Sequence, residues 1–132
     1  MNKLVYCAQP GRLSNRKREV MNFVLEQGYA PLHPFQAFPY DLFEGGKVGR
    51  EKTMEFCQRL IKAADEFWLF GVSEGTLQDL TYALKIKKPV KVFLDFDPEW
   101  ETYYKKIKRE VQKLTRIFLD ILSINYLNFR FK

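Results

Sequence analysis

Four residues of the 132-residue chain, Gln9, Pro10, Gly11 and Arg12, form a turn whose side chains suit a polar ligand. The turn follows a short apolar run and precedes a helical pattern. Arg12 can form a paired hydrogen bond with a phosphate or a carboxylate, and Gln9 and Gly11 stand beside it. A solvated basic turn explains the same residues equally well. The turn is neither a Walker loop nor a dinucleotide motif, because the sequence contains no Gly-Lys-Ser/Thr and no GxGxxG.

A second turn, Ser73-Glu74-Gly75-Thr76, also leads from an apolar run into a helical pattern. The free N–H groups at a helix start favour an anion, and the two hydroxyl groups add donors. Gly75 lets a ligand approach the backbone closely. The alternative needs no ligand, since Thr76 and Asp79 have the spacing of a capping box in which Asp79 closes back on the cap. The residues alone favour the capping interpretation.

Two isolated polar residues are further candidates. His33 is the only histidine, and a structural role is favoured over one in polarising a ligand. Asp65 begins an apolar run, where it can bind a sugar hydroxyl or serve as an ordinary charged residue at a strand start. One histidine and scattered carboxylates do not supply a metal ligand set. We therefore expect neither a metal nor a cofactor.

The segment Pro34–Gly49 combines prolines and glycines with the aromatic residues Phe35, Phe38, Tyr40 and Phe43. Its turn residues predict a long loop without a regular element. Loops of this length in small domains are usually functional. The aromatic side chains, Phe35 among them, can stack on a base, or they can simply cover the sheet.

The rest of the chain alternates between strand and helix patterns. The expected strands are Lys3–Ala8, Tyr29–His33, Glu66–Phe70 and Pro89–Leu94. The expected helices run from an N-cap at Ser14 to a C′ residue at Gly28, over Arg50–Ala64, and over Thr76–Lys87. This order predicts an α/β fold with a parallel sheet of four or five strands between two layers of helices. Ligands of such sheets bind at the carboxyl ends of the strands, where both turns lie.

The C-terminal part begins with Asp97 as an N-cap and Pro98 at the first helical position. Apolar residues then recur in a heptad-like pattern as far as Ile121, which predicts one long helix lying on the domain or against a partner helix. Asn125–Lys132 alternates like a final strand. We expect a single domain over residues 1–132, with a core at 1–96 and an extension at 97–132.

Composition narrows the classes further. The two cysteines form no CxxC pair, which argues against a disulfide scaffold and a zinc knuckle. Free thiols, the lack of a signal peptide and the lack of a long apolar run predict a cytoplasmic protein without a membrane partner. The net charge of +6 can attract nucleic acid or phosphorylated ligands, although a solvated helix face is the favoured explanation.

The strand followed by Pro-Gly-Arg, then GYAPLHPF, AADEFWLFG and SEGTLQDLTYALKIKKPV, resembles the nucleoside 2-deoxyribosyltransferase-like superfamily, in particular its small uncharacterised members. The resemblance runs from about Lys3 to Leu94. It implies a flavodoxin-like (Rossmann-like) sheet, a homodimer or larger homo-oligomer, and hydrolase or transferase action on the N-glycosidic bond of a deoxynucleoside or its monophosphate. It also implies that Gly11 and Arg12 lie near a phosphate.

Several positions correspond to functional residues of that superfamily. Asp79 stands where a glutamate attacks C1′, and it keeps the carboxylate with one methylene fewer. Ser73 and Gly75 match phosphate-binding residues of the monophosphate hydrolases. Asp65 matches an aspartate that holds the sugar, whereas Thr81 replaces a glycine. A carboxylate at this place can stabilise or trap the oxocarbenium-like transition state of glycosidic cleavage.

Three hypotheses follow, in order of preference. The first is an enzyme that cleaves or transfers the N-glycosidic bond, with Asp79 as nucleophile and a second acid from Asp41 or Glu44. The second is a non-catalytic module that binds a nucleoside or nucleotide, which the departures at Asp79 and Thr81 favour. The third is association with nucleic acid through the basic segment Lys105–Arg116.

Overall fold

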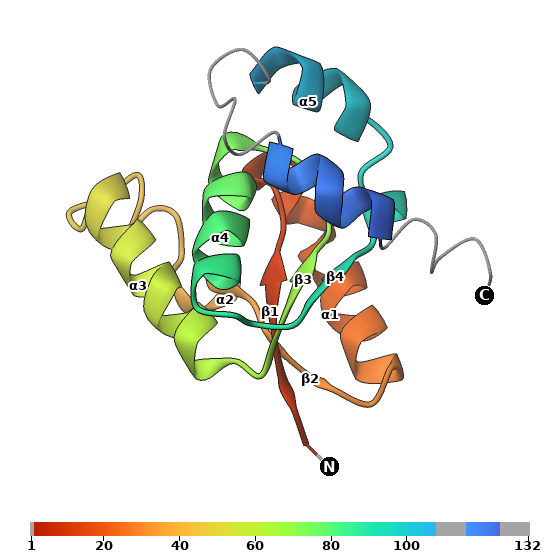
Figure 1. Ribbon diagram of the computed structural model, residues 1–132. Coiled ribbons are helices and arrows are strands. Elements are labelled where there is room, and N and C mark those ends of the chain that lie inside the picture. The colour runs from red at the N-terminus through yellow and green to blue at the C-terminus, as the bar shows by residue number, and fades with distance from the viewer. Residues whose placement is uncertain (1, 108–115, 125–132) are drawn as a thin grey trace.

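A four-stranded parallel sheet forms the centre of the computed structural model, which describes residues 2–107 and 116–124 (Figure 1). The strand order is β2-β1-β3-β4. β1 pairs in parallel with both β2 and β3, and β3 pairs in parallel with β4. The chain therefore changes direction across the sheet between β1 and β3, as in flavodoxin-like folds. The predicted α/β fold is confirmed, with strands at Leu4–Ala8 (β1), Ala30–Leu32 (β2), Glu66–Leu69 (β3) and Val90–Val92 (β4).

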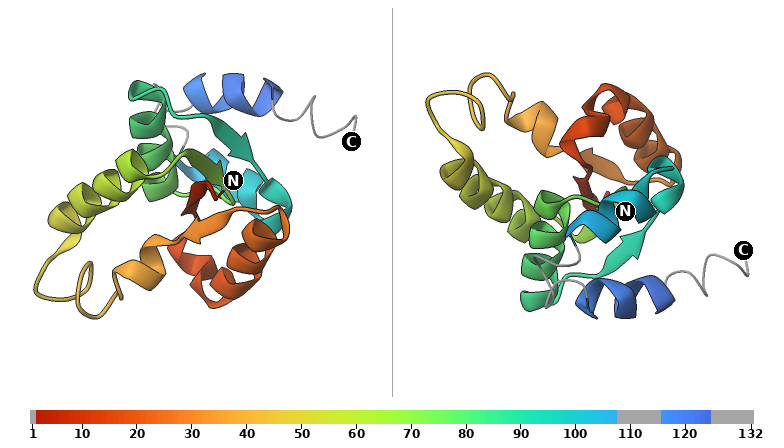
Figure 2. Two further views of the ribbon diagram at one scale, coloured as in Figure 1. Left: turned by 90° about the horizontal axis from the view of Figure 1, so that it is seen from below. Right: turned by 90° about the horizontal axis from the view of Figure 1, so that it is seen from above.

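Helices cover both faces of this sheet, as Figure 2 shows. Residues of α1 pack with one face of β1 and β3, while residues of α3 and α4 pack on the other. Among the described residues, no helix has the length and apolar character that crossing a membrane requires. The helical elements are η1 (Gly11–Arg16), α1 (Lys17–Glu26), α2 (Pro34–Ala37), α3 (Arg50–Ala63), α4 (Glu74–Lys85), η2 (Leu94–Phe96), α5 (Trp100–Ile107) and a helix over residues 116–124.

Strand β1 shows how the sequence builds the two layers. Successive side chains of a strand point to opposite faces of the sheet. Val5 and Cys7 accordingly belong to the core beside α1, whereas Tyr6 and Ala8 belong to the core beside α3 and α4. All four are at most 1% exposed, so β1 is a central strand buried on both faces.

Helix α4 begins two residues earlier than predicted, and this changes its cap. Ser73 is the N-cap, with its hydroxyl oxygen accepting from the amide of Thr76 at 3.1 Å. The hydroxyl oxygen of Thr76 in turn accepts from the amide of Ser73 at 2.9 Å. The predicted capping box between Thr76 and Asp79 is therefore wrong. Asp79 lies inside the helix and is released from any capping role.

Two predictions for the first half of the chain are also corrected. Ser14 lies in the 3₁₀ helix η1, and α1 begins only at Lys17, without a side-chain cap. The segment predicted to lack regular structure contains α2, because His33 caps it by accepting from the amide of Phe35. By contrast, Gly28 ends α1 with a φ of 88°, a left-handed conformation that favours glycine, as predicted.

The C-terminal helical pattern is not one straight helix. Residues 14 positions apart in a continuous helix are separated by about 21 Å. The rings of Tyr104 and Phe118 are instead 5.2 Å apart, so the helix over residues 116–124 lies back against α5. The predicted strand at residues 125–132 and most of the basic segment Lys105–Arg116 lie outside the described residues.

A fully buried carboxylate, that of Asp97, connects the ends of β1 and β3. It accepts from the guanidinium of Arg12, beyond β1, and from the amide of Val72, beyond β3, at 2.9 Å. The Arg12 guanidinium also donates to the Val72 carbonyl at 2.6 Å and stacks on Tyr103 at 3.5 Å. A Cβ added at Gly71 would lie 2.9 Å from Oδ2 of Asp97, so the residues are in close contact.

We predict that Asp97→Ala lowers the free energy of unfolding by about 3–5 kcal/mol, because it leaves the largely buried Arg12 guanidinium without its anion. Urea unfolding followed by circular dichroism measures the change. The matched control is Asp95→Ala, which removes an exposed carboxylate of η2 and should cost less than about 0.5 kcal/mol. Equal losses in the two variants would contradict the structural role of Asp97.

Candidate functional site

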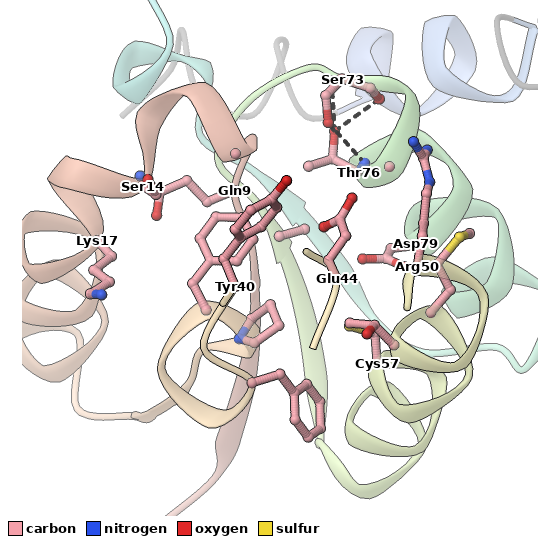
Figure 3. Close-up of a pocket in the computed structure, with 18 of the residues that line it drawn as sticks. Gln9, Ser14, Lys17, Tyr40, Glu44, Arg50, Cys57, Ser73, Thr76 and Asp79 are labelled. Atoms are coloured by element: carbon pink, nitrogen blue, oxygen red, sulfur yellow. Dashed lines mark hydrogen bonds between the residues drawn. The ribbon is translucent and has the colours of Figure 1, made fainter. Parts of the chain in front are cut away.

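A cavity of about 890 Å³ opens at the carboxyl ends of β1 and β3 (Figure 3). Parallel α/β sheets bind ligands at this position, where the strand order reverses, and the volume is in the range of small-molecule sites. The walls come from the two strand-end turns, the segment after β2, α3 and α4. Seven of the ten residues predicted from sequence line it: Gln9, Gly11, Phe35, Ser73, Gly75, Thr76 and Asp79.

The carboxyl group of Asp79 is the principal titratable group of the cavity. Its Oδ2 accepts a hydrogen bond of 2.9 Å from the hydroxyl of Tyr6. Burial raises the pKa of Asp79 to about 7, and the Tyr6 hydrogen bond partly opposes that rise. Tyr6 is fully buried and stacks on Phe67 at 5.4 Å, so its hydroxyl is held in place. A carboxyl with a pKa near neutrality can act as a nucleophile or in proton transfer.

Gly75 leaves the approach to Asp79 open. The two residues are four positions apart in α4 and therefore lie on the same face of the helix. A Cβ added at Gly75 would meet only the Ser73 hydroxyl oxygen, at 3.9 Å. A Cβ at Gly11, across the cavity, would meet nothing within 4 Å. Neither glycine is required by packing, so both leave space that a ligand can occupy.

The hydroxyl groups of the second turn are already engaged. Thr76 donates its hydroxyl to the carbonyl of Gly71 at 2.9 Å, and Ser73 caps α4. What this turn still offers a ligand is the N–H groups of Glu74 and Gly75, because the Ser73 hydroxyl already caps the amide of Thr76. The sequence-based expectation of an anion at this turn therefore depends on backbone amides rather than hydroxyl groups.

Three predicted site residues do not line the cavity. Arg12 is bound to Asp97 and Val72, so its guanidinium is held away from the cavity. Asp65 lies at the amino end of β3, where its carboxylate accepts from the amide of Leu4 at 2.8 Å. In a parallel sheet that is the edge opposite the cavity, and this position separates Asp65 from the other candidates.

His33 is the third of these residues, and it has a structural role. Its Nδ1 accepts from the amide of Phe35, so Nε2 donates to the side-chain oxygen of Gln9 at 2.7 Å. The amide of Gln9 then donates to the carbonyl of Leu13 at 2.8 Å. Burial, and then the charge of Lys17, lowers the pKa of His33 to about 4, so the ring is neutral. This chain of bonds orients Gln9, which does line the cavity.

Sequence reasoning missed other lining residues. Tyr6 lies in the predicted strand Lys3–Ala8, and a tyrosine in an apolar run gives no sign that its hydroxyl reaches an aspartate 73 positions away. Cys57 lies beside Tyr6 and Asp79; burial first, and then the charge of Asp79, raises the pKa of its thiol to about 12. The thiol is therefore protonated and a poor nucleophile. Lys17 and Arg50 add positive charge at the walls.

No three histidine, cysteine, aspartate or glutamate side chains gather into a group that could hold a metal ion, within residues 2–107 and 116–124. A family model described as a domain of unknown function (DUF7768) matches residues 6–93. The chain belongs to this family. Neither the curated proteins nor the solved structures contain a match to it. The matched part of the DUF7768 domain includes both strand-end turns and Asp79, and thus the cavity.

We predict that Asp79→Asn stabilises the DUF7768 domain increasingly as pH rises from 5 to 8. In the wild type the unfolded carboxyl ionises near pH 4 but the folded one only near 7, so the unfolded state binds fewer protons between these values and stability falls as pH rises. Each pKa unit corresponds to about 1.4 kcal/mol, so the gap between variant and wild type should widen by about 2–4 kcal/mol. Denaturant unfolding at several pH values measures it, and parallel curves would contradict the raised pKa.

Proposed function

We propose that the DUF7768 domain binds a nucleoside or nucleoside monophosphate in the cavity and cleaves or transfers its N-glycosidic bond, with Asp79 as the nucleophile. The observation that carries the proposal is the carboxyl of Asp79, which opens onto the cavity and is oriented by the Tyr6 hydroxyl. The resemblance to the nucleoside 2-deoxyribosyltransferase-like superfamily supports it, because Asp79 stands where those enzymes have their nucleophilic glutamate.

The chemistry asks for a carboxylate at C1′ of the sugar. Cleavage of the C1′–N bond produces an oxocarbenium-like transition state, which Asp79 can stabilise or trap as an ester. Tyr6 donates to Oδ2, which leaves Oδ1 without a hydrogen-bond partner among the described residues and available to the sugar. The same hydrogen bond favours the ionised form that a nucleophile needs.

The remaining walls suit the other parts of such a ligand. Phe35 and Tyr40 line the cavity with aromatic rings, on which a base can stack. Lys17 and Arg50 line the cavity as positively charged residues, which favours a phosphorylated ligand. Arg12, in contrast, has no part in this proposal, because Asp97 holds its guanidinium.

We predict that the purified protein releases free base from deoxynucleoside monophosphates, measured by liquid chromatography, and that Asp79→Asn lowers this rate at least about 1000-fold, since it removes the nucleophile. The wild-type rate should rise with pH up to about 7, as Asp79 ionises. Asp65→Asn is the control, because Asp65 lies at the opposite edge of the sheet, and it should retain wild-type activity.

Two results would contradict the proposal in different ways. Nucleotide binding by calorimetry without base release would contradict the catalytic part and identify a non-catalytic binding module on the same fold. The feature that favours such a module is the aspartate at position 79, whose side chain is one methylene shorter than the nucleophilic glutamate of the superfamily. An absence of binding with every nucleoside and nucleotide tested would contradict the assigned ligand class as well.

A further inference from the structure

The loop over residues 38–49 forms a preformed wall of the cavity. Backbone hydrogen bonds close it on itself: the amide of Gly45 donates to the carbonyl of Tyr40 at 2.9 Å, and the amide of Gly49 donates to that of Phe43 at 2.7 Å. Phe43 also contacts Phe38 and, on α3, Phe56, with ring centroids 4.9 and 6.3 Å away. The loop is therefore attached to α3 through aromatic contacts as well as bonded internally.

Two glycines of this loop lie close to its other half, and at Gly46 the backbone leaves no room for a side chain. A Cβ at Gly46 would lie 2.2 Å from the carbonyl oxygen of Asp41, and one at Gly45 would lie 2.4 Å from the ring of Tyr40. Contacts under 3 Å force a shift, and at Gly46 the obstacle is backbone. The backbone next to Glu44 is thus held by the hydrogen bond between Gly45 and Tyr40 and by the close packing of Gly46 on the backbone of Asp41.

From this fixed backbone, the carboxylate of Glu44 projects into the cavity. Figure 3 shows it between Tyr40 and Asp79. Its charge is close enough to Cys57 to contribute to the raised pKa of that thiol. Within the described part of the chain, Glu44 forms no hydrogen bond and no ion pair. A carboxylate in this position presents acceptors to whatever the cavity holds.

We propose that Glu44 determines base specificity, accepting a hydrogen bond from the exocyclic amino group of the nucleobase. The inference rests on the proposed function, since it takes the ligand to be a nucleoside or nucleotide. An ionised carboxylate can only accept hydrogen bonds, so it pairs with an amino group and repels a carbonyl in the same place. The cavity therefore selects bases such as cytosine and adenine over uracil and hypoxanthine, which carry oxygen at the corresponding position.

The ring of Tyr40 supports the same assignment. It is 70% exposed, yet it lies against Gly45 in close contact and lines the cavity. A base stacked on this ring would direct its polar edge to neighbouring groups of the loop. Glu44 is the carboxylate that Figure 3 places beside the ring. Stacking by Tyr40 and edge recognition by Glu44 are thus two contacts with one base.

The test measures the binding of two matched pairs, dCMP against dUMP and dAMP against dIMP, by calorimetry on the full chain. The Asp79→Asn background prevents cleavage during the titration. We expect the amino member of each pair to bind about tenfold more tightly. In Glu44→Gln this preference should vanish or reverse, because the amide can turn its NH₂ group toward a carbonyl. Glu51→Gln removes an exposed carboxylate near the start of α3 that does not line the cavity, and it should keep the preference.

The outcomes separate this inference from the proposal on which it rests. Equal binding of both members, or a preference that persists in Glu44→Gln, would overturn the role of Glu44 while leaving nucleotide binding intact. Binding with the expected preference but no base release in the wild type would contradict only the catalytic step. No binding of any of the four nucleotides would overturn both. Melting temperatures of the variants check that each is folded.

Discussion

The carboxylate of Asp97 holds together the two turns between which the cavity opens. It binds the Arg12 guanidinium beyond β1 and the Val72 amide beyond β3, in a place without solvent exposure. A buried charge that loses its partners costs several kcal/mol, so this arrangement of the two turns depends on both contacts of Asp97. The two turns can approach each other this closely only because residue 71 is a glycine: a Cβ there would lie 2.6 Å from Pro10.

The same contacts explain how the carboxyl groups of Asp97 and Asp79 differ. Asp97 is paired with a cation, whereas Asp79 is hydrogen-bonded, among the residues that the structure describes, to the Tyr6 hydroxyl alone, and burial raises the pKa of Asp79. Loss of either partner from the buried Asp97–Arg12 pair would leave an uncompensated charge and destabilise the fold. A carboxyl kept without a cation costs stability at neutral pH, and this kind of cost is typical of functional sites. Because Arg12 is paired with Asp97, it does not supply a cation to the cavity. The pKa of Asp79 lies near neutrality.

The sequence predicted the order of the elements and the position of the cavity because hydrophobic periodicity and strand-end turns are local signals. It did not predict the start of α4, since Ser73 with Thr76 and Thr76 with Asp79 both fit a capping pattern locally. The sequence also contains no local signal for the pairing of Arg12 with Asp97, because the two residues are 85 positions apart. The position of Asp65 could have been predicted, because the start of a parallel strand lies at the edge opposite its end. Glu44 was named as a candidate, but only the close packing of its loop places it in the cavity.

The short side chain at position 79 and the missing one at position 75 belong to one arrangement. An aspartate holds its carboxyl about 1.5 Å closer to the helix backbone than a glutamate would. At that depth it reaches the Tyr6 hydroxyl, which comes from the middle of a buried strand. If the proposed function is correct, a reacting sugar has to approach α4 more closely, and Gly75, on the same face of the helix, leaves the space open. In the proposed reaction, the sugar can reach the recessed carboxyl of Asp79 because Gly75, one helical turn before it, carries no side chain.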